Sequence, residues 1–222
     1  MIREGLSHRR NGLGSLAAWT ISFLLIAYGV VTALGFVSLQ STDDPIGDPY
    51  FTLMELLIVI LAPLIVILWG VVYVQARSET KIFALVSLVF MSLMAGITSC
   101  GHFVVLTVGR PLMATGEAWA IHTFSFSWPS VVYTLDILAW DWFFPLALLF
   151  AVPVFNQGRI EKTIRVFLVV SGVLSLAGLI GVPLGNMQIR NIGIVGYAVV
   201  SLGVFICLGV LFHGKELGRV RR

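Results

Sequence analysis

The sequence predicts an all-α integral membrane protein, built as a single bundle of six transmembrane helices with both termini in the cytoplasm. Three observations predict this fold class. Of the 222 residues, 58% are hydrophobic and 11% are charged, with a mean hydropathy of +0.98, whereas soluble domains carry about 25% charged residues. Six apolar stretches are long enough to cross a bilayer, and the basic residues gather on one side of them. So little polar surface excludes a soluble enzyme and a disordered regulator.

The spans are counted from the requirement for about 20 apolar residues per crossing of a core about 30 Å thick. They occupy approximately residues 15–39, 50–75, 82–108, 131–155, 164–184 and 191–212. The first is longer than the 7–15 apolar residues of a cleaved signal peptide, so it is predicted to be a retained helix. Because the connectors are short except for 109–130, residues 1–222 are predicted to form one domain.

The distribution of Lys and Arg predicts the orientation. With the N-terminus in the cytoplasm, 12 of the 14 basic residues fall inside, and only Arg110 and Arg190 fall outside. The inside set is Arg3, Arg9, Arg10, Arg77, Lys81, Arg159, Lys162, Arg165, Lys215, Arg219, Arg221 and Arg222. This is the positive-inside bias of multi-pass proteins. It explains the net charge of +3 without a nucleic-acid partner, and the bilayer is the partner it predicts.

The fifth and sixth spans are rich in small residues. Ala177, Gly181 and Gly185 recur every four residues, a pattern that lets helix backbones approach closely. Packing within the chain is the favoured interpretation, and a homo- or hetero-oligomer contact through these helices is the alternative. With no ionisable residue at their centres, these spans are not expected to carry chemistry.

The two cysteines, Cys100 and Cys207, lie at different depths in the membrane, roughly 10 Å apart at a rise of 1.5 Å per residue. This separation is too large for a disulfide, so both are predicted to be free thiols.

Four ionisable residues lie within the predicted spans, where each costs about 2.5–3.5 kcal/mol on insertion scales. They are Glu55 in the second span, His102 in the third, and Asp136 and Asp141 in the fourth. All lie in the outer half or at the midplane, and Asp141 is the deepest. If they converge, they define an acidic pocket between helices 2, 3 and 4 that opens to the outside.

Proline and spacing refine this hypothesis. Pro145 cannot donate a hydrogen bond, so it frees the backbone carbonyl of Asp141. Asp136 and Asp141 are five residues apart, which separates them by about 140° around an α-helix, so they share one face only if the helix is distorted. For Asp136, two roles are given equal weight: a structural clamp between helices and a part of the binding site. For Asp141, a role in the binding site is favoured.

The connector 109–130 carries Trp119, Phe124, Phe126 and Trp128. Aromatic residues at a span edge are typical of a membrane interface, so an interfacial loop or short helix is the favoured interpretation. The functional alternative is a lid over the outward-facing pocket, to which Glu117 and His122 would contribute.

Enzymatic and metal chemistry have weaker signals. Ser99 and His102 are three residues apart on one helical face, and a nucleophile there would need Asp136 or Glu55 to orient the histidine. A packed histidine bonded to a carboxylate is the favoured alternative. No HxxH, HExxH or CxxC spacing occurs, so no metal site is predicted, and the sequence names no cofactor.

The run from Leu138 to Phe150, LAWDWFFPLALLF, followed by SGVLSLAG at 171–178, resembles uncharacterised six-helix bacterial membrane proteins of unknown function. The resemblance covers the second half of the chain. It implies a bacterial or archaeal inner membrane and carries over no activity.

Three functions are therefore considered. The first is an outward-opening pocket that binds or translocates a small cationic or amphipathic ligand, with Asp141 as the central anion and Glu55, Asp136 and His102 in support. The second is an intramembrane enzyme acting on a lipid or isoprenoid, which requires His102 and a carboxylate in an open cleft. The third is an accessory or assembly subunit of a membrane complex.

Overall fold

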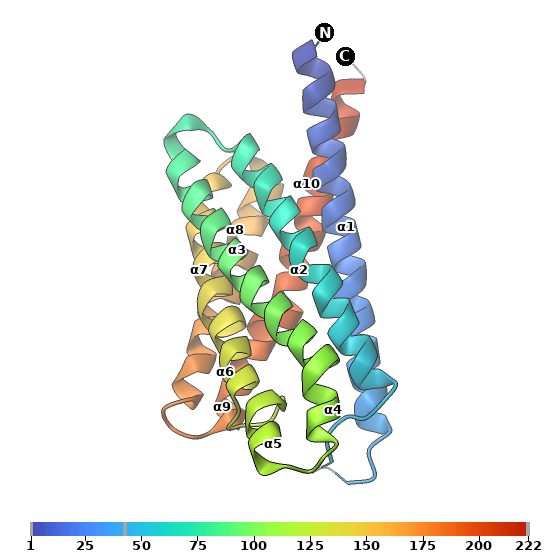
Figure 1. Ribbon diagram of the computed structural model, residues 1–222. Helices are drawn as coiled ribbons and strands as arrows, with labels where there is room; N and C mark the ends of the chain where they lie inside the picture. The colour runs from blue at the N-terminus through green and yellow to red at the C-terminus, as the bar shows by residue number, and fades with distance from the viewer. Residues whose placement is uncertain (1, 42–43, 221–222) are drawn as a thin grey trace.

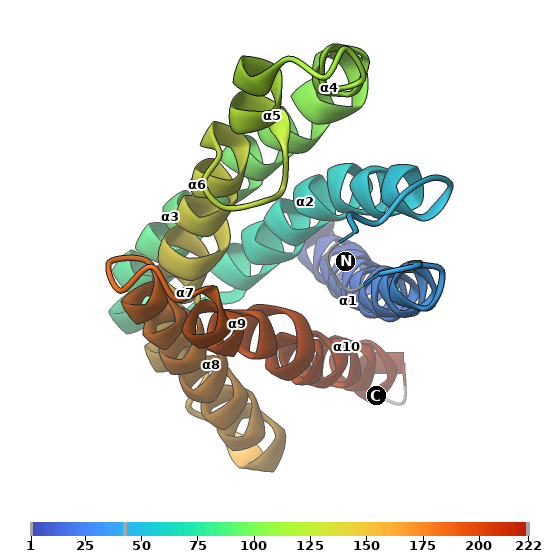
Figure 2. The same cartoon turned by 90° about the horizontal axis from the view of Figure 1, so that it is seen from below.

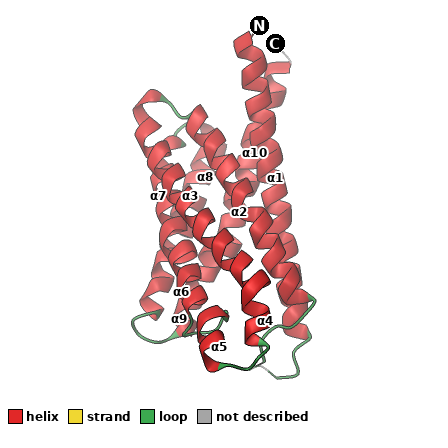
Figure 3. Ribbon diagram, in the orientation of Figure 1, coloured by secondary structure: helices red, strands yellow, loops and turns green. Residues whose placement is uncertain are grey.

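The computed structural model describes the backbone of residues 2–41 and 44–220 and the side chains of residues 9–41 and 44–215. Within these ranges the secondary structure is helical, with no strand (Figure 3). The side chains of Arg3, Arg219, Arg221 and Arg222, which contribute to the predicted charge bias, lie outside the described residues.

Six long apolar helices confirm the predicted bundle. The helix bounds are α1 Ile2–Val37, α2 Tyr50–Gln75, α3 Lys81–Val104, α4 Arg110–Met113, α5 Ala118–Phe124, α6 Val131–Ile137, α7 Phe144–Ala151, α8 Gly158–Gly178, α9 Met187–Ile194 and α10 Ser201–Val220. Four spans begin four to six residues before their approximate predicted starts: at Arg9 instead of 15, Ser78 instead of 82, Gly158 instead of 164 and Met187 instead of 191. The last difference matters, because it moves Arg190 from a loop into a helix.

Three spans contain a stretch of wider π-helix. Val105–Gly109 joins α3 to α4, Leu138–Phe143 joins α6 to α7, and Val195–Val200 joins α9 to α10. A π-helical turn bonds residues five apart and shifts the faces on either side of it relative to each other. Two of these stretches border the polar residues discussed below.

The long helices pack side by side in a closed ring, each against its neighbours (Figures 1 and 2). Helix α1 contacts α2 and α10, α2 contacts α3, and α3 contacts α7. Helix α8 packs against α7 on one side and against α9 and α10 on the other. The first and last described residues lie at one end of the bundle (Figure 1), which we call the terminal end. The short helices α4 and α5 lie at the other, which we call the distal end.

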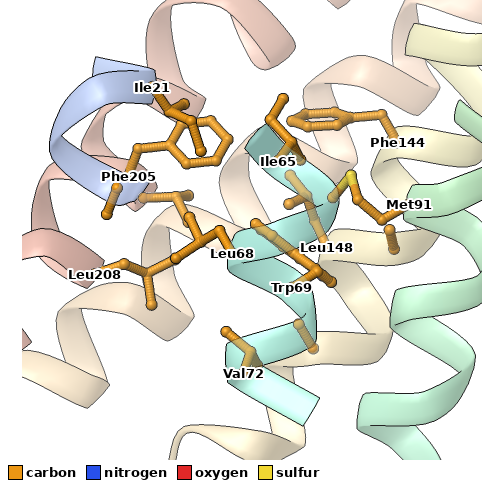
Figure 4. Packing of buried hydrophobic residues seen from close by; sticks show 14 of the residues in the cluster. Ile21, Ile65, Leu68, Trp69, Val72, Met91, Phe144, Leu148, Phe205 and Leu208 are labelled. Carbon is orange, nitrogen blue, oxygen red and sulfur yellow. The ribbon is translucent and has the colours of Figure 1, made fainter. Parts of the chain in front are cut away.

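An apolar core fills the centre of the bundle (Figure 4). Leu68 and Trp69 of α2 are buried, and the Trp69 ring packs edge-on against Phe205 of α10, with ring centroids 6.1 Å apart. Apolar side chains also cover the outside: Phe23 is 68% exposed and Val166 is 61% exposed. Apolar residues both inside and outside are expected of a bundle surrounded by lipid, where helices associate through packing and polar contacts.

One hydrogen-bonded chain crosses this core. The Trp69 indole N–H donates to the Ser87 hydroxyl (2.7 Å), which donates to the Ala147 carbonyl oxygen (2.5 Å). The chain therefore links α2, α3 and α7 through one fully buried hydroxyl.

We expect Ser87→Ala to destabilise the protein by about 1–3 kcal/mol, because it leaves a buried indole N–H and a buried carbonyl without their partner. Thermal unfolding in detergent micelles measures the effect. Ser92→Ala is the matched control, since that exposed hydroxyl bonds only to the Leu88 carbonyl of its own helix. Equal effects of the two substitutions would contradict this role of Ser87.

Candidate functional site

Glu55 and His102 form the first contact of a buried polar network near the distal end. Glu55 lies in the second turn of α2 and His102 near the end of α3, and they are 3% and 6% exposed. Because α2 and α3 are antiparallel neighbours, the two side chains reach the same depth. The His102 Nδ1 atom lies 2.9 Å from Glu55 Oε2, at hydrogen-bond distance.

The other ring nitrogen of His102 faces a second carboxylate. Nε2 lies 3.5 Å from Asp136 Oδ1, on α6. The imidazole thus stands between two acids from two different helices. Both ring nitrogens face carboxylates, and among the described residues no contact joins Ser99 to the imidazole, so the nucleophile hypothesis has no geometric support.

Arg190 is the residue that sequence reasoning missed. The sixth span was predicted to begin at 191 and to leave Arg190 outside it, whereas α9 begins at Met187 and buries Arg190 to 2% exposure. Its Nη2 atom lies 3.1 Å from Asp141 Oδ2 and 3.7 Å from Asp136 Oδ2. The guanidinium carbon lies 5.0 Å from the ring centre of Tyr133 and 5.6 Å from that of Tyr197, within range of cation–π attraction.

The π-helical stretch Leu138–Phe143 explains how Asp136 and Asp141 reach the same guanidinium. Its wider turn is bonded from the Phe144 N–H to the Ala139 carbonyl, five residues back. A five-residue separation then approaches one full turn instead of the 140° of an α-helix. Pro145 lies two residues after this stretch, and proline is a recognised cause of such irregularity because it lacks an N–H. The predicted distortion is therefore present.

Glycines of α9 and of the helical turn that follows α8 make room for this arrangement. A Cβ atom built on Gly193 would lie 1.9 Å from Asp141 Oδ1 and 3.3 Å from the Ser175 carbonyl oxygen, and one on Gly181 would lie 2.5 Å from the Arg190 backbone nitrogen. The predicted close packing of the last two spans is thus present within the chain. Gly185 is not part of it: it lies in the α8–α9 turn with a φ of +61°, which glycine adopts readily.

Phe126 closes the distal side of the network. Its ring stacks on the His102 imidazole, with centroids 4.9 Å apart and planes inclined by 28°. A crevice between Phe126, His102, Asp136 and the adjoining faces of α3 and α6 is too narrow to admit a water molecule. The connector 109–130 thus covers the site, and the predicted outward-opening pocket is closed in this structure. Asp136, at 15% exposure, is the most accessible acid of the network.

Other predicted candidates lie apart from the network. His122 contacts the Pro129 carbonyl oxygen at 3.4 Å, and Glu117 is exposed. Cys100 and Cys207 are free thiols, as predicted. Among the side chains that the structure describes, no group of three or more His, Cys, Asp or Glu is arranged to hold a metal ion.

The network is therefore a continuous alternation of acids and bases: Glu55, His102, Asp136, Arg190 and Asp141. It joins four of the six spans. In the described part of the chain, three atoms of the network are buried without a hydrogen-bond partner: His102 Nε2, Asp141 Oδ1 and Arg190 Nε. The hydroxyl of the neighbouring Ser175 is buried without a partner as well. Buried polar groups are normally paired, so these atoms mark positions where the network has unused bonding capacity.

Fold and site together define a multi-pass membrane protein of six helices with a buried acid–base network. Comparisons of the chain with models of known protein families, with curated proteins and with solved structures find no match. What the network does must therefore be argued from its own geometry.

Proposed function

We propose that this membrane protein binds a proton or another small cation in the network of Glu55, His102, Asp136, Arg190 and Asp141, and that this binding serves translocation across the membrane. The bound cation would enter from the distal end. By the positive-inside bias this end faces outward, and the resemblance noted above implies a bacterial or archaeal inner membrane.

The observation that carries the proposal is the charge inventory of the network. Three carboxylates face one guanidinium and one imidazole. If every acid is ionised, the network carries a net charge of −1 with a protonated histidine and −2 with a neutral one. An unbalanced buried charge is expensive in a membrane. A purely structural network would be balanced, whereas this one needs at least one further positive charge.

The narrowness of the crevice favours a very small ligand. No space for a water molecule lies beside Asp136 and His102, so an amphipathic molecule would not fit without movement of Phe126. A proton needs no cavity. The stacked Phe126 ring and the connector that carries it supply a cover whose displacement would admit water to Asp136 and His102.

Asp136→Asn tests the proposal. If the native network holds a proton that the unfolded chain releases, stability falls as pH rises, by up to about 1.4 kcal/mol per pH unit for one proton. We expect this slope in the wild type and a flatter one in Asp136→Asn, because removing one carboxylate removes the excess charge. Thermal unfolding in detergent micelles over a pH series, with and without Na⁺ and K⁺, measures both slopes.

The control for that experiment is Glu79→Gln, which neutralises an exposed acid at the terminal end and should keep the wild-type slope. Equal slopes in the wild type and Asp136→Asn, with no response to either cation, would contradict a binding role and leave the network a structural clamp.

The two alternatives receive less support. An intramembrane enzyme requires His102 in an open cleft, whereas both of its nitrogens face carboxylates and Phe126 covers the ring. An accessory subunit was expected to use the glycines of the last two spans as a contact face. Gly178 and Gly193 instead pack against each other within the chain, which leaves them unavailable to a partner.

A further inference from the structure

A second polar feature lies at the terminal end, far along the spans from the acid–base network. It is a cavity of about 80 Å³ between the ends of α2, α7 and α10 and the start of α8. A cavity needs only about 10–15 Å³ to hold one water, so this one has room for several waters or for one tetrahedral anion. The proposed function makes no use of it.

The cavity has an apolar floor and a polar rim. Val72, Phe155 and Phe212 form the floor and are at most 5% exposed. The charged members of the rim are Arg77, Glu161 and Lys215. Two cations and one carboxylate thus face the same space, leaving an excess of one positive charge.

The carboxylate is already engaged. Glu161 Oε2 accepts a hydrogen bond from the Gln157 backbone N–H (2.7 Å), which secures the start of α8, and Oε1 lies 3.7 Å from Lys215 Nζ. Its negative charge is therefore held at one edge of the cavity by the fold itself.

The cations retain unused donors. With the Gln157 amide turned so that its oxygen faces Arg77, the guanidinium donates two hydrogen bonds to it (2.8 and 3.2 Å). A guanidinium has five N–H donors and an ammonium has three. The amide fixes the guanidinium at the rim, and its remaining donors together with those of Lys215 are available to an anion.

We infer that this cavity is a binding site for a phosphate group, carried either by the headgroup of an anionic lipid or by free phosphate. Arginine recognises phosphate oxygens through paired N–H donors, and lysine adds a point charge. The rim lies at the helix ends, the depth at which headgroups lie. Basic pockets between transmembrane helices on the cytoplasmic side commonly hold anionic headgroups.

The experiment measures thermal unfolding of the full chain in neutral detergent, with three additions in separate arms: phosphatidylglycerol, phosphatidylcholine and inorganic phosphate. A ligand that binds only the folded state raises Tm. We expect phosphatidylglycerol, inorganic phosphate or both to raise Tm of the wild type, and the effect to be at least halved in Arg77→Gln and in Lys215→Gln. A response to phosphatidylglycerol alone identifies a lipid headgroup, and a response to inorganic phosphate identifies the free anion.

Arg159→Gln and Lys162→Gln are matched controls, because each removes one exposed positive charge at the same end without lining the cavity. Either control should respond as the wild type does. Three results would overturn the inference: no rise in Tm with either phosphate compound, an equal rise with phosphatidylcholine, or an equal loss in the control variants. Because Arg77 and Lys215 come from different elements, a folding defect in one variant leaves the other as a test.

Discussion

Arg190→Met is expected to destabilise the protein by about 3–5 kcal/mol, the effect of removing one partner from a buried ion pair. The guanidinium is 2% exposed, and Asp141, its nearest acid at 3.1 Å, is fully buried. Methionine replaces the length of the side chain without its charge, so Asp141 and Asp136 would remain close together with no cation between them. Chemical denaturation in detergent micelles measures the change in the free energy of unfolding.

Arg110→Met is the matched control for this prediction. Arg110 pairs with Asp48 at the distal end, where the two side chains are 33% and 46% exposed, and an exposed ion pair contributes about 0–1 kcal/mol. Combining Arg190→Met with Asp141→Asn should recover part of the loss, because neutral asparagine does not need the guanidinium. A loss no larger than that of Arg110→Met would mean that the network does not depend on this charge.

Hydropathy and charge predicted the six spans because both are properties of individual residues and do not depend on how the chain folds. The convergence of Glu55 and His102 was also predictable, since antiparallel neighbouring helices bring residues of similar depth together. The depth of Arg190 was not predicted, because a basic residue at the edge of an apolar stretch is most simply assigned to the loop.

A local signal for Arg190 was present in the sequence. The Asn186 side chain accepts hydrogen bonds from the backbone N–H groups of Gln188 and Ile189, and asparagine before an apolar run is a typical helix start. That signal would have placed Arg190 one turn inside the sixth span, opposite the fourth.

The meeting of Asp136 and Asp141 depends on backbone geometry that composition does not encode. An α-helical wheel separates them, and only the wider turn before Pro145 brings both toward Arg190. Proline predicted a distortion but not its form, because a kink and a π-helical turn both relieve the missing hydrogen bond. The position of Phe126 over the site could not be predicted from the sequence either, because its stacking on His102 depends on how a long connector folds back.

Gly193→Ala is the second substitution with a large expected effect, about 3 kcal/mol, at the upper end of the usual cost of overpacking. Its new Cβ would lie 1.9 Å from Asp141 Oδ1. The carboxylate cannot simply retreat, because its other oxygen contacts Arg190, and the new Cβ would also lie 3.3 Å from the Ser175 carbonyl oxygen. The substitution therefore forces α9 away from the fourth and fifth spans or breaks the Arg190–Asp141 pair.

Gly96→Ala separates this contact from the general effect of adding a methyl group to a helix. A Cβ on Gly96 meets no atom within 4 Å, so alanine there should be neutral or stabilising by up to about 1 kcal/mol through its higher helix propensity. Asp141→Ala removes the atom that the new methyl would strike, so Gly193→Ala should cost less in that background than in the wild type. Equal costs in the two backgrounds would mean that the methyl group acts elsewhere, and that the fit of Gly193 against Asp141 is not what holds α9 in place.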